Sequence, residues 1–128
     1  MYIKYMRNNP IKEKSFDFAL AIVRLSRYLV DEKREYTLSK QLLRSGTAIG
    51  ALIREAEHAQ SKPDFIHKLS ISLKEANETE YWIQLLYQSD YLQQATFTDM
   101  RSKVGELNRL LIAIIKSTKH NLLTRNQH

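Results

Sequence analysis

Two short motifs in the sequence pair a carboxylate with a histidine at a spacing that could bind a metal ion. Glu55 and His58 form an E-x-x-H motif, and Asp64 and His67 form a D-x-x-H motif. Di-iron helical bundles use two E-x-x-H motifs and two further glutamates, all directed into the bundle. Here His58, Asp64 and His67 project from the polar sides of their expected helices, near the turn at residues 60–63. We therefore expect no metal site and no metal cofactor.

The sequence has little that could support covalent or hydrolytic catalysis. It contains no cysteine, no Gly-rich phosphate loop and no G-x-S-x-G or H-E-x-x-H motif. Arg54 precedes His58 by a shorter interval than the arginine-to-histidine spacing of the HEPN ribonucleases. We predict that the protein is not an enzyme, with no catalytic residue and no cofactor. A metal-dependent or hydrolytic enzyme is the least favoured alternative.

One carboxylate falls within an apolar helical stripe. Glu80 lies between Ala76 and Ile83 in the expected third helix, and an unpaired buried charge costs several kcal/mol. Its expected partners are Arg44 and Arg27. A general acid or base is the functional alternative, whereas a structural ion pair that fixes the helix register is the interpretation we favour. The predicted structural polar core therefore consists of Arg27, Arg44 and Glu80.

The positive charge is concentrated at the two ends of the chain. The net charge is +6, from 20 Lys and Arg against 14 Asp and Glu. Residues 1–34 and 99–128 each carry four more bases than acids, whereas residues 35–98 carry two more acids than bases. If the two ends lie side by side, they form a basic face that attracts phosphate polymers. The predicted phosphate contacts are Lys12, Lys14, Arg24, Arg101, Arg109, Lys116 and Lys119.

The elements that must position these residues are expected to be long helices. Three glycines and two prolines are too few for a fold rich in tight turns. Asn9-Pro10 predicts the start of a first helix, Thr37 or Ser39 the cap of a second, and Thr98-Asp99 the cap of a fourth. The stretch from Ser61 to Asp64 ends the second helix and begins the third.

The expected organisation is one all-α domain. The predicted helices cover residues 10–32, 38–60, 63–88 and 98–119, within a bundle of residues 11–120, an N-terminal arm of residues 1–10 and a flexible C-terminal tail of residues 121–128. Short connections between such helices predict an antiparallel up-down-up-down four-helix bundle. No apolar run approaches the roughly 18 residues of a membrane span, and the N-terminus lacks the apolar stretch of a signal peptide. A cytoplasmic protein without a membrane partner is therefore expected.

Apolar residues cover more of two helices than a single bundle requires. The fourth helix has one seam with alternating spacings of three and four residues. The first and third helices carry apolar residues on more than one side, although a bundle helix that faces solvent needs only an apolar stripe of about 100°. We therefore predict a homo-oligomer. The predicted interface residues are Phe18, Leu25, Ile71, Trp82, Leu85 and Leu86.

From Leu38, the chain resembles a family of small bacterial four-helix bundle proteins. The resemblance is carried by LSKQLLRSGTAIGALIREAEHAQSKPDFIHKLSISLKEANETEYWIQLL, and it extends over about residues 12–119. Its most specific parts are Arg44-Ser45 with Ile49, Ile53 and Glu55, then Lys74-Glu75-Ala76 and Glu78-Thr79-Glu80-Tyr81-Trp82. The family includes the protein encoded by intervening sequences within 23S ribosomal RNA genes.

The resemblance implies an antiparallel bundle that assembles as a ring, with a pentamer expected. A relative in this family, the accessory variability protein of diversity-generating retroelements, is a basic ring that binds nucleic acid and a reverse transcriptase. The chain has Ala48, Leu52 and Ala56 where many members have Ser, Asn and Gly. The polar network inside the second helix is therefore expected to be thinner here.

Together, these observations predict a non-enzymatic, oligomeric helical bundle that binds RNA, another nucleic acid or a ribonucleoprotein through its basic first and fourth helices. Such contacts position a polyanion without reading its sequence. An adaptor ring that recruits a protein partner, such as a reverse transcriptase, is the alternative.

Overall fold

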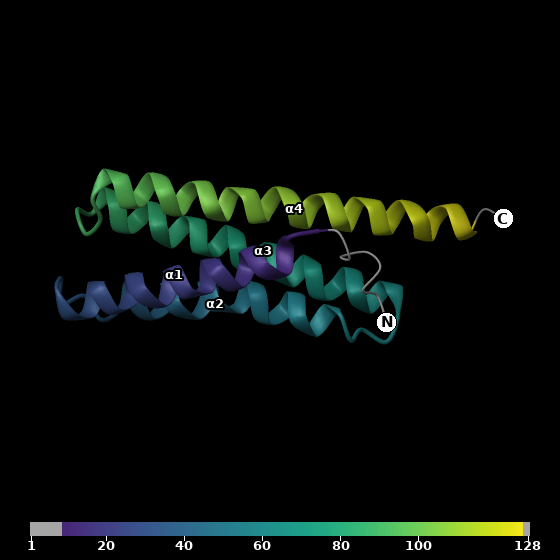
Figure 1. Ribbon diagram of the computed structural model, residues 1–128, viewed down its shortest axis with the longest axis horizontal. Coiled ribbons are helices and arrows are strands. Elements are labelled where there is room, and N and C mark those ends of the chain that lie inside the picture. Colours follow the sequence, from purple (N-terminus) through teal and green to yellow (C-terminus); the bar gives the residue numbers. More distant parts are fainter. Residues whose placement is uncertain (1–8, 127–128) are drawn as a thin grey trace.

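The computed structural model describes residues 9–126, and the side chains up to residue 123, as four α-helices joined by short connections (Figure 1). Consecutive helices run in opposite directions, and α4 extends beyond the other three at its C-terminal end (Figure 1). The predicted all-α bundle is therefore confirmed. The helices are α1 (Ile11–Asp31), α2 (Leu38–Ala56), α3 (Lys62–Gln88) and α4 (Gln94–Asn126). Most of the expected N-terminal arm, residues 1–8, lies outside the described residues.

The start of α1 follows from an asparagine and a proline. The Asn9 Oδ1 accepts a hydrogen bond from the backbone N–H of Ile11 at 3.0 Å, and Pro10 accepts the first bond of the helix from Lys14. The asparagine satisfies a backbone donor that no earlier turn can reach. Proline is well tolerated at this place because it lacks the N–H that would otherwise stay unpaired.

The cap of α2 differs from the prediction. Neither Thr37 nor Ser39 caps the helix with its side chain. The Glu35 carboxylate does so instead, because it accepts from the backbone N–H of Ser39 at 2.7 Å and of Thr37 at 3.1 Å. The helix also ends at Ala56 rather than at residue 60.

The third helix begins with a reciprocal cap. The Ser61 Oγ accepts from the backbone N–H of Asp64 at 3.1 Å, and the Asp64 carboxylate accepts from the backbone N–H of Gln60 at 3.2 Å. Pro63 lies in the first turn, as it does in many helices. The helix runs to Gln88, and its bounds differ by one residue at the start from the predicted range of 63–88.

The fourth helix is longer than predicted at both ends. It begins at Gln94, before the expected cap at Thr98-Asp99, and it continues to Asn126. Asp90 takes a positive φ of 71° and turns the chain, so that the next helix starts within a few residues. The Phe97 ring then stacks on Tyr87 with centroids 4.1 Å apart. This packing outweighs the local capping signal, and the stretch expected to be a tail is helical up to Asn126.

The core of the bundle contains the predicted seam of α4. Met100, Val104, Leu107, Leu111 and Ile114 are buried, and Phe97 is partly buried. The first two helices approach each other closely at Gly46, where an added Cβ would lie only 2.7 Å from the Ile22 side chain. The Ser72 hydroxyl donates to the Ile49 carbonyl at 2.9 Å and joins α3 to α2.

The first helix contacts α2 along its length but has only a small contact with α4. That contact includes an ion pair between Lys14 and Glu106, 2.5 Å long. Farther along, the two helices diverge (Figure 1), and Leu25 and Tyr28 of α1 line a cavity of about 220 Å³ together with Leu92, Gln93 and Thr96. The expectation that the two basic ends of the chain lie side by side therefore holds only near the N-terminal end of α1.

Candidate nucleic-acid interface

Four basic residues form one exposed stripe along the outer side of α4. At 100° per residue, Arg101, Arg109, Lys116 and Lys119 project within about 80° of one another. All four are exposed, and the positions between them on this face, Gly105 and Ile112, carry no charge. We call these four residues the α4 stripe.

The charge of the α4 stripe is not neutralised within the described part of the chain. Asp99 pairs with Lys103 at 3.0 Å, and Glu106 pairs with Lys14, so both acids of α4 have other partners. No ion pair joins a stripe residue to another residue in the range 9–123. The Arg101 guanidinium lies 5.7 Å from the centre of the Phe97 ring, a cation–π contact that leaves its charge available. The stripe therefore presents a positive surface that can attract a polyanion electrostatically.

The three predicted contacts on α1 do not join this stripe. The Lys12 Nζ lies 2.6 Å from a carboxylate oxygen of Glu57, and Lys14 pairs with Glu106. Both lysines thus have an opposite charge beside them. Arg24 is exposed, but it lies on a helix with only a small contact to α4. The structure brings four of the seven predicted phosphate contacts onto one face.

The predicted polar core of Arg27, Arg44 and Glu80 is wrong. Arg27 is exposed on α1, and Arg44 lies at the surface between α2 and α3. The partly buried Glu80 carboxylate accepts from the Asn108 Nδ2 at 3.4 Å, so its partner comes from α4. Glu80 is about 60° from the centre of the buried side of α3, at 100° per residue. That rotation moves it to the edge of the apolar stripe.

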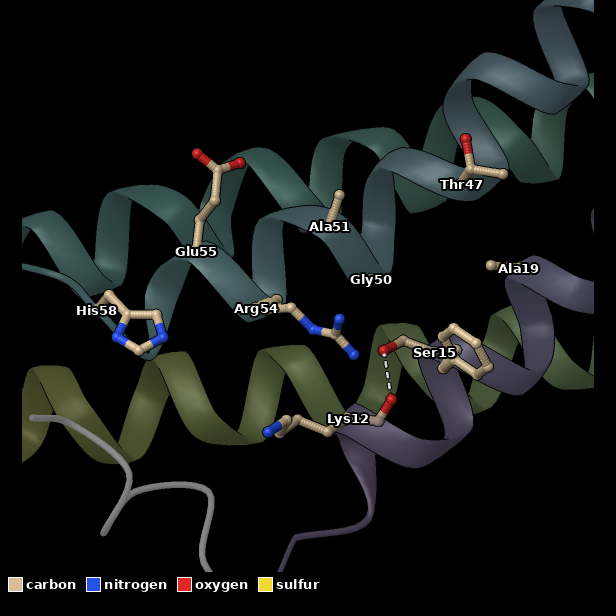
Figure 2. A pocket seen from close by; sticks show the side chains of 10 residues that line it. Lys12, Ser15, Ala19, Thr47, Gly50, Ala51, Arg54, Glu55 and His58 are labelled. Carbon is tan, nitrogen blue, oxygen red and sulfur yellow. Dashed lines mark hydrogen bonds between the residues drawn. The ribbon is translucent and has the colours of Figure 1, made fainter.

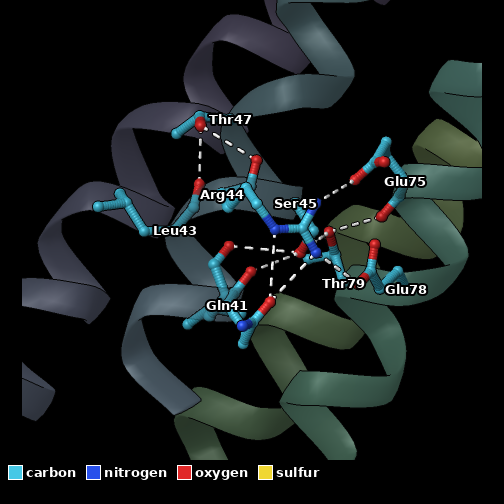
Figure 3. Close-up of polar contacts among 9 residues, drawn as sticks. Gln41, Leu43, Arg44, Ser45, Thr47, Glu75, Glu78 and Thr79 are labelled. Carbon is cyan, nitrogen blue, oxygen red and sulfur yellow. Dashed lines mark hydrogen bonds and ion pairs between the residues drawn. The ribbon is translucent and has the colours of Figure 1, made fainter. Parts of the chain in front are cut away.

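Arg44 instead joins α2 to α3 through two glutamates (Figure 3). Its guanidinium lies 2.5 Å from a carboxylate oxygen of Glu78 and 3.5 Å from one of Glu75, and it also donates to the Gln41 side chain. Burial and the neighbouring negative charge of Glu78 raise the pKa of the Glu75 carboxyl, and Arg44 opposes this shift. This cluster is a contact between α2 and α3.

Next to this cluster lies a buried hydroxyl pair that the sequence analysis did not identify. The Thr79 hydroxyl lies 2.9 Å from the Ser45 Oγ and also donates to the Glu75 carbonyl, and both residues are fully buried (Figure 3). A hydroxyl within an apolar stripe, as at Thr79, is the signal that could have revealed it. Together with the Ser72–Ile49 hydrogen bond, it joins the buried sides of α2 and α3.

The predicted oligomer interface is partly buried inside the single chain. Phe18, Leu25 and Leu86 belong to the core, with exposed fractions of 2%, 7% and 0%. Each of α1 and α3 contacts two other helices, so a wide apolar arc is covered within the bundle. Ile71 and Trp82 are partly buried, and Leu85 is exposed.

A groove of about 590 Å³ lies between α1 and α2 (Figure 2). It is lined by Phe16 and Ala19 from α1, by Gly50 and Ala51 from α2, and at one end by Lys12, Arg54 and His58. In the sequence, Arg54 and His58 stand out only as possible catalytic or metal-binding residues. The groove could not be predicted from the sequence because the residues that face each other across it come from two helices.

The described residues hold no metal-binding cluster. No group of three His, Asp or Glu side chains in the part of the chain seen here is close enough to hold an ion. Asp64 is instead engaged at the N-terminus of α3, where it accepts from Gln60. Within residues 9–126, no helix is long and apolar enough to cross a membrane.

The fold and the surface define a four-helix bundle that presents a basic stripe on α4. Residues 7–113 match the 23S rRNA-intervening sequence protein family. The chain therefore belongs to that family, and the resemblance found in the sequence is confirmed.

The bundle is also similar to a crystal structure from Bacteroides thetaiotaomicron. That structure is of a protein with unknown function from the S23 ribosomal protein family, and it is 55% identical to this chain. The likeness covers 83% of this chain and 98% of the other, with a TM-score of 0.82. No curated protein matches the sequence.

Proposed function

We propose that this protein is a non-enzymatic RNA-binding bundle that contacts the phosphate backbone through the α4 stripe. The observation that carries the proposal is the exposure of four basic residues on one face of α4 that holds no acidic residue: Arg101, Arg109, Lys116 and Lys119. Lysine and arginine bind phosphates through charge-assisted hydrogen bonds, and such contacts do not depend on base sequence. Membership in a family described by a 23S rRNA intervening sequence supports RNA as the polyanion.

Charge reversal of the α4 stripe tests this proposal. The variant Arg109→Glu, Lys116→Glu, Lys119→Glu should weaken binding of a labelled RNA oligonucleotide at least about tenfold at low salt. It should also reduce the slope of log affinity against log salt by about three, one unit for each lost phosphate contact. Fluorescence anisotropy at several salt concentrations measures both quantities. Because all three residues are exposed, the bundle should stay folded.

A matched control distinguishes the effect of the α4 stripe on RNA binding from the effect of the net charge. The variant Lys33→Glu, Lys40→Glu, Lys74→Glu changes the charge by the same amount at exposed positions on the other helices or their connections. It should retain most of the affinity and the salt slope. Equal losses in the two variants would overturn the assignment to α4. Salt-resistant binding of a co-purifying protein, together with no affinity for RNA, would support the adaptor function instead.

We also propose that the protein self-associates through α3, as a ring for which the family resemblance suggests five copies. Support comes from Tyr81 and Leu85, which are 59% and 36% exposed although both are large and apolar. Trp82 is partly buried beside them, with its ring edge-on to Tyr81 at 5.0 Å. Exposed aromatic and aliphatic residues that lie together are typical of interfaces.

A further inference from the structure

The groove between α1 and α2 combines an exposed aromatic ring with a shallow floor. The Phe16 side chain lines the groove although it is 53% exposed. At the floor the two helices are close, since a Cβ on Gly50 would lie 3.3 Å from the Ser15 Oγ. The small residues Ala19 and Ala51 leave the space above the floor open. The volume of about 590 Å³ lies in the range of pockets that bind small ligands.

The charge at one end of the groove is positive. Arg54 is exposed and has no ion pair with another residue in the described range, and its guanidinium points across the groove towards Lys12 and Ser15 (Figure 2). Lys12 keeps half of its side chain exposed while it pairs with Glu57. The one acid in the lining, Glu55, points away from Arg54 and lies 3.5 Å from the Lys68 Nζ.

A flat apolar surface next to a free guanidinium has the chemistry that recognises a nucleotide. Aromatic side chains stack on nucleobases without a preference for sequence, and arginine binds phosphate oxygens in a fork geometry. We propose that the groove between α1 and α2 binds a nucleoside phosphate, with the base against Phe16 and the phosphate at Arg54. The ligand is a free nucleotide or one unit of an RNA strand, and the two sources share this chemistry. The site does not depend on the α4 stripe, because it uses other helices.

Isothermal titration calorimetry of the purified full-length chain tests the site with three probes. AMP should bind more tightly than adenosine, which lacks the phosphate, and more tightly than ribose 5-phosphate, which lacks the base. A 5′-phosphorylated RNA tetranucleotide identifies the source. If it binds more tightly than AMP, and Phe16→Leu removes that advantage, the groove takes a unit of a strand; if AMP binds equally well, the groove takes a free nucleotide. A fatty-acid anion that binds while AMP does not would overturn the proposal.

Two variants and one control locate the binding. Phe16→Leu keeps an apolar side chain but removes the ring, and Arg54→Gln removes the charge. Each should weaken AMP binding about tenfold. Arg109→Gln, on the α4 stripe, should weaken RNA binding and leave AMP binding unchanged, so that failure of the groove and failure of the stripe are distinguishable. Circular dichroism checks that the exposed substitutions leave the helices intact. No AMP binding to the unaltered chain, or equal binding by all variants, would overturn the proposal.

Discussion

Several carboxylates of this protein pair with residues that are distant in sequence, so their partners could not be identified from the sequence. Glu80 was expected to be the buried acid, but Glu75, whose side chain is 17% exposed, is the carboxyl whose pKa burial and the neighbouring Glu78 raise. Arg44 bridges both glutamates, yet only its contact with Glu78 is short. An electrostatic pH dependence of stability should therefore originate at Glu75.

Replacing Glu75 by Gln should stabilise the protein at neutral pH. Because the pKa of the folded-state carboxyl is raised above the ordinary value of 4.5, the stabilising contribution of Glu75 is present below that value and lost as the pH rises through the folded pKa. Glutamine resembles the protonated form and should add roughly 0.5 kcal/mol at pH 7. The gain should disappear below about pH 4. Thermal unfolding of both proteins across this range measures it.

The control for this prediction is Glu78→Gln, which removes the 2.5 Å contact with Arg44. It should not stabilise the protein at pH 7. A Glu75→Gln variant that is less stable than the natural chain at pH 7, or equally different at every pH, would contradict the assignment.

At the scale of the helices, α1 and α2 pack closely at two glycines of α2. Gly46 and Gly50 both face α1, where an added Cβ would lie 2.7 Å from Ile22 and 3.3 Å from Ser15. Glycine in a helix interior is otherwise unfavourable by about 1 kcal/mol relative to alanine. The close approach of the two helices also shapes the floor of the groove.

Gly46→Ala and Gly105→Ala should have opposite effects on stability. The Gly46 substitution pushes against the buried Ile22 side chain and should lower the free energy of unfolding by about 1–2 kcal/mol, although helix propensity improves. At Gly105 the nearest atom is the end of the flexible Arg109 side chain at 3.5 Å, so alanine should add about 0.5–1 kcal/mol. Urea unfolding at equal protein concentration measures both. Two changes of the same sign would contradict the packing argument.

At the scale of the whole molecule, the three proposed surfaces lie on different elements. The α4 stripe follows α4, whereas the exposed Tyr81 and Leu85 lie on α3 and the groove lies between α1 and α2. Self-association through α3 would therefore leave the α4 stripe uncovered by the residues that make the contact. A ring would repeat the stripe and increase the affinity for a long polyanion by multivalency.

The proposed self-association predicts a particle several times heavier than the 15.1 kDa chain. Tyr81→Lys with Leu85→Lys should lower the mass measured by sedimentation or light scattering, because charges are costly in an apolar contact. Tyr36→Lys is the matched control, since Tyr36 is 55% exposed in the connection before α2 and should leave the mass unchanged. A monomer at micromolar concentration would rule out the ring.

Much of the fold could be predicted because it depends on local signals. The seam from Met100 to Ile114 follows from helical periodicity, and the starts of α1 and α3 follow from Asn9-Pro10 and from Ser61 to Asp64. Less of the candidate site could be predicted from the sequence. Arg109, Lys116 and Lys119 lie on one helix, so their spacing was sufficient, whereas the partners of Lys12 and Lys14 come from residues distant in sequence.

The amino-acid sequence by itself determined the class of fold, the helical content and the basic side of α4, because periodicity and charge within one helix need no knowledge of its neighbours. Only the tertiary structure decided which acids neutralise which bases, that Phe18, Leu25 and Leu86 are core residues, and that Phe16 and Arg54 line the same groove. These properties depend on how each helix is rotated about its axis. That rotation is set by packing contacts such as Gly46 on Ile22.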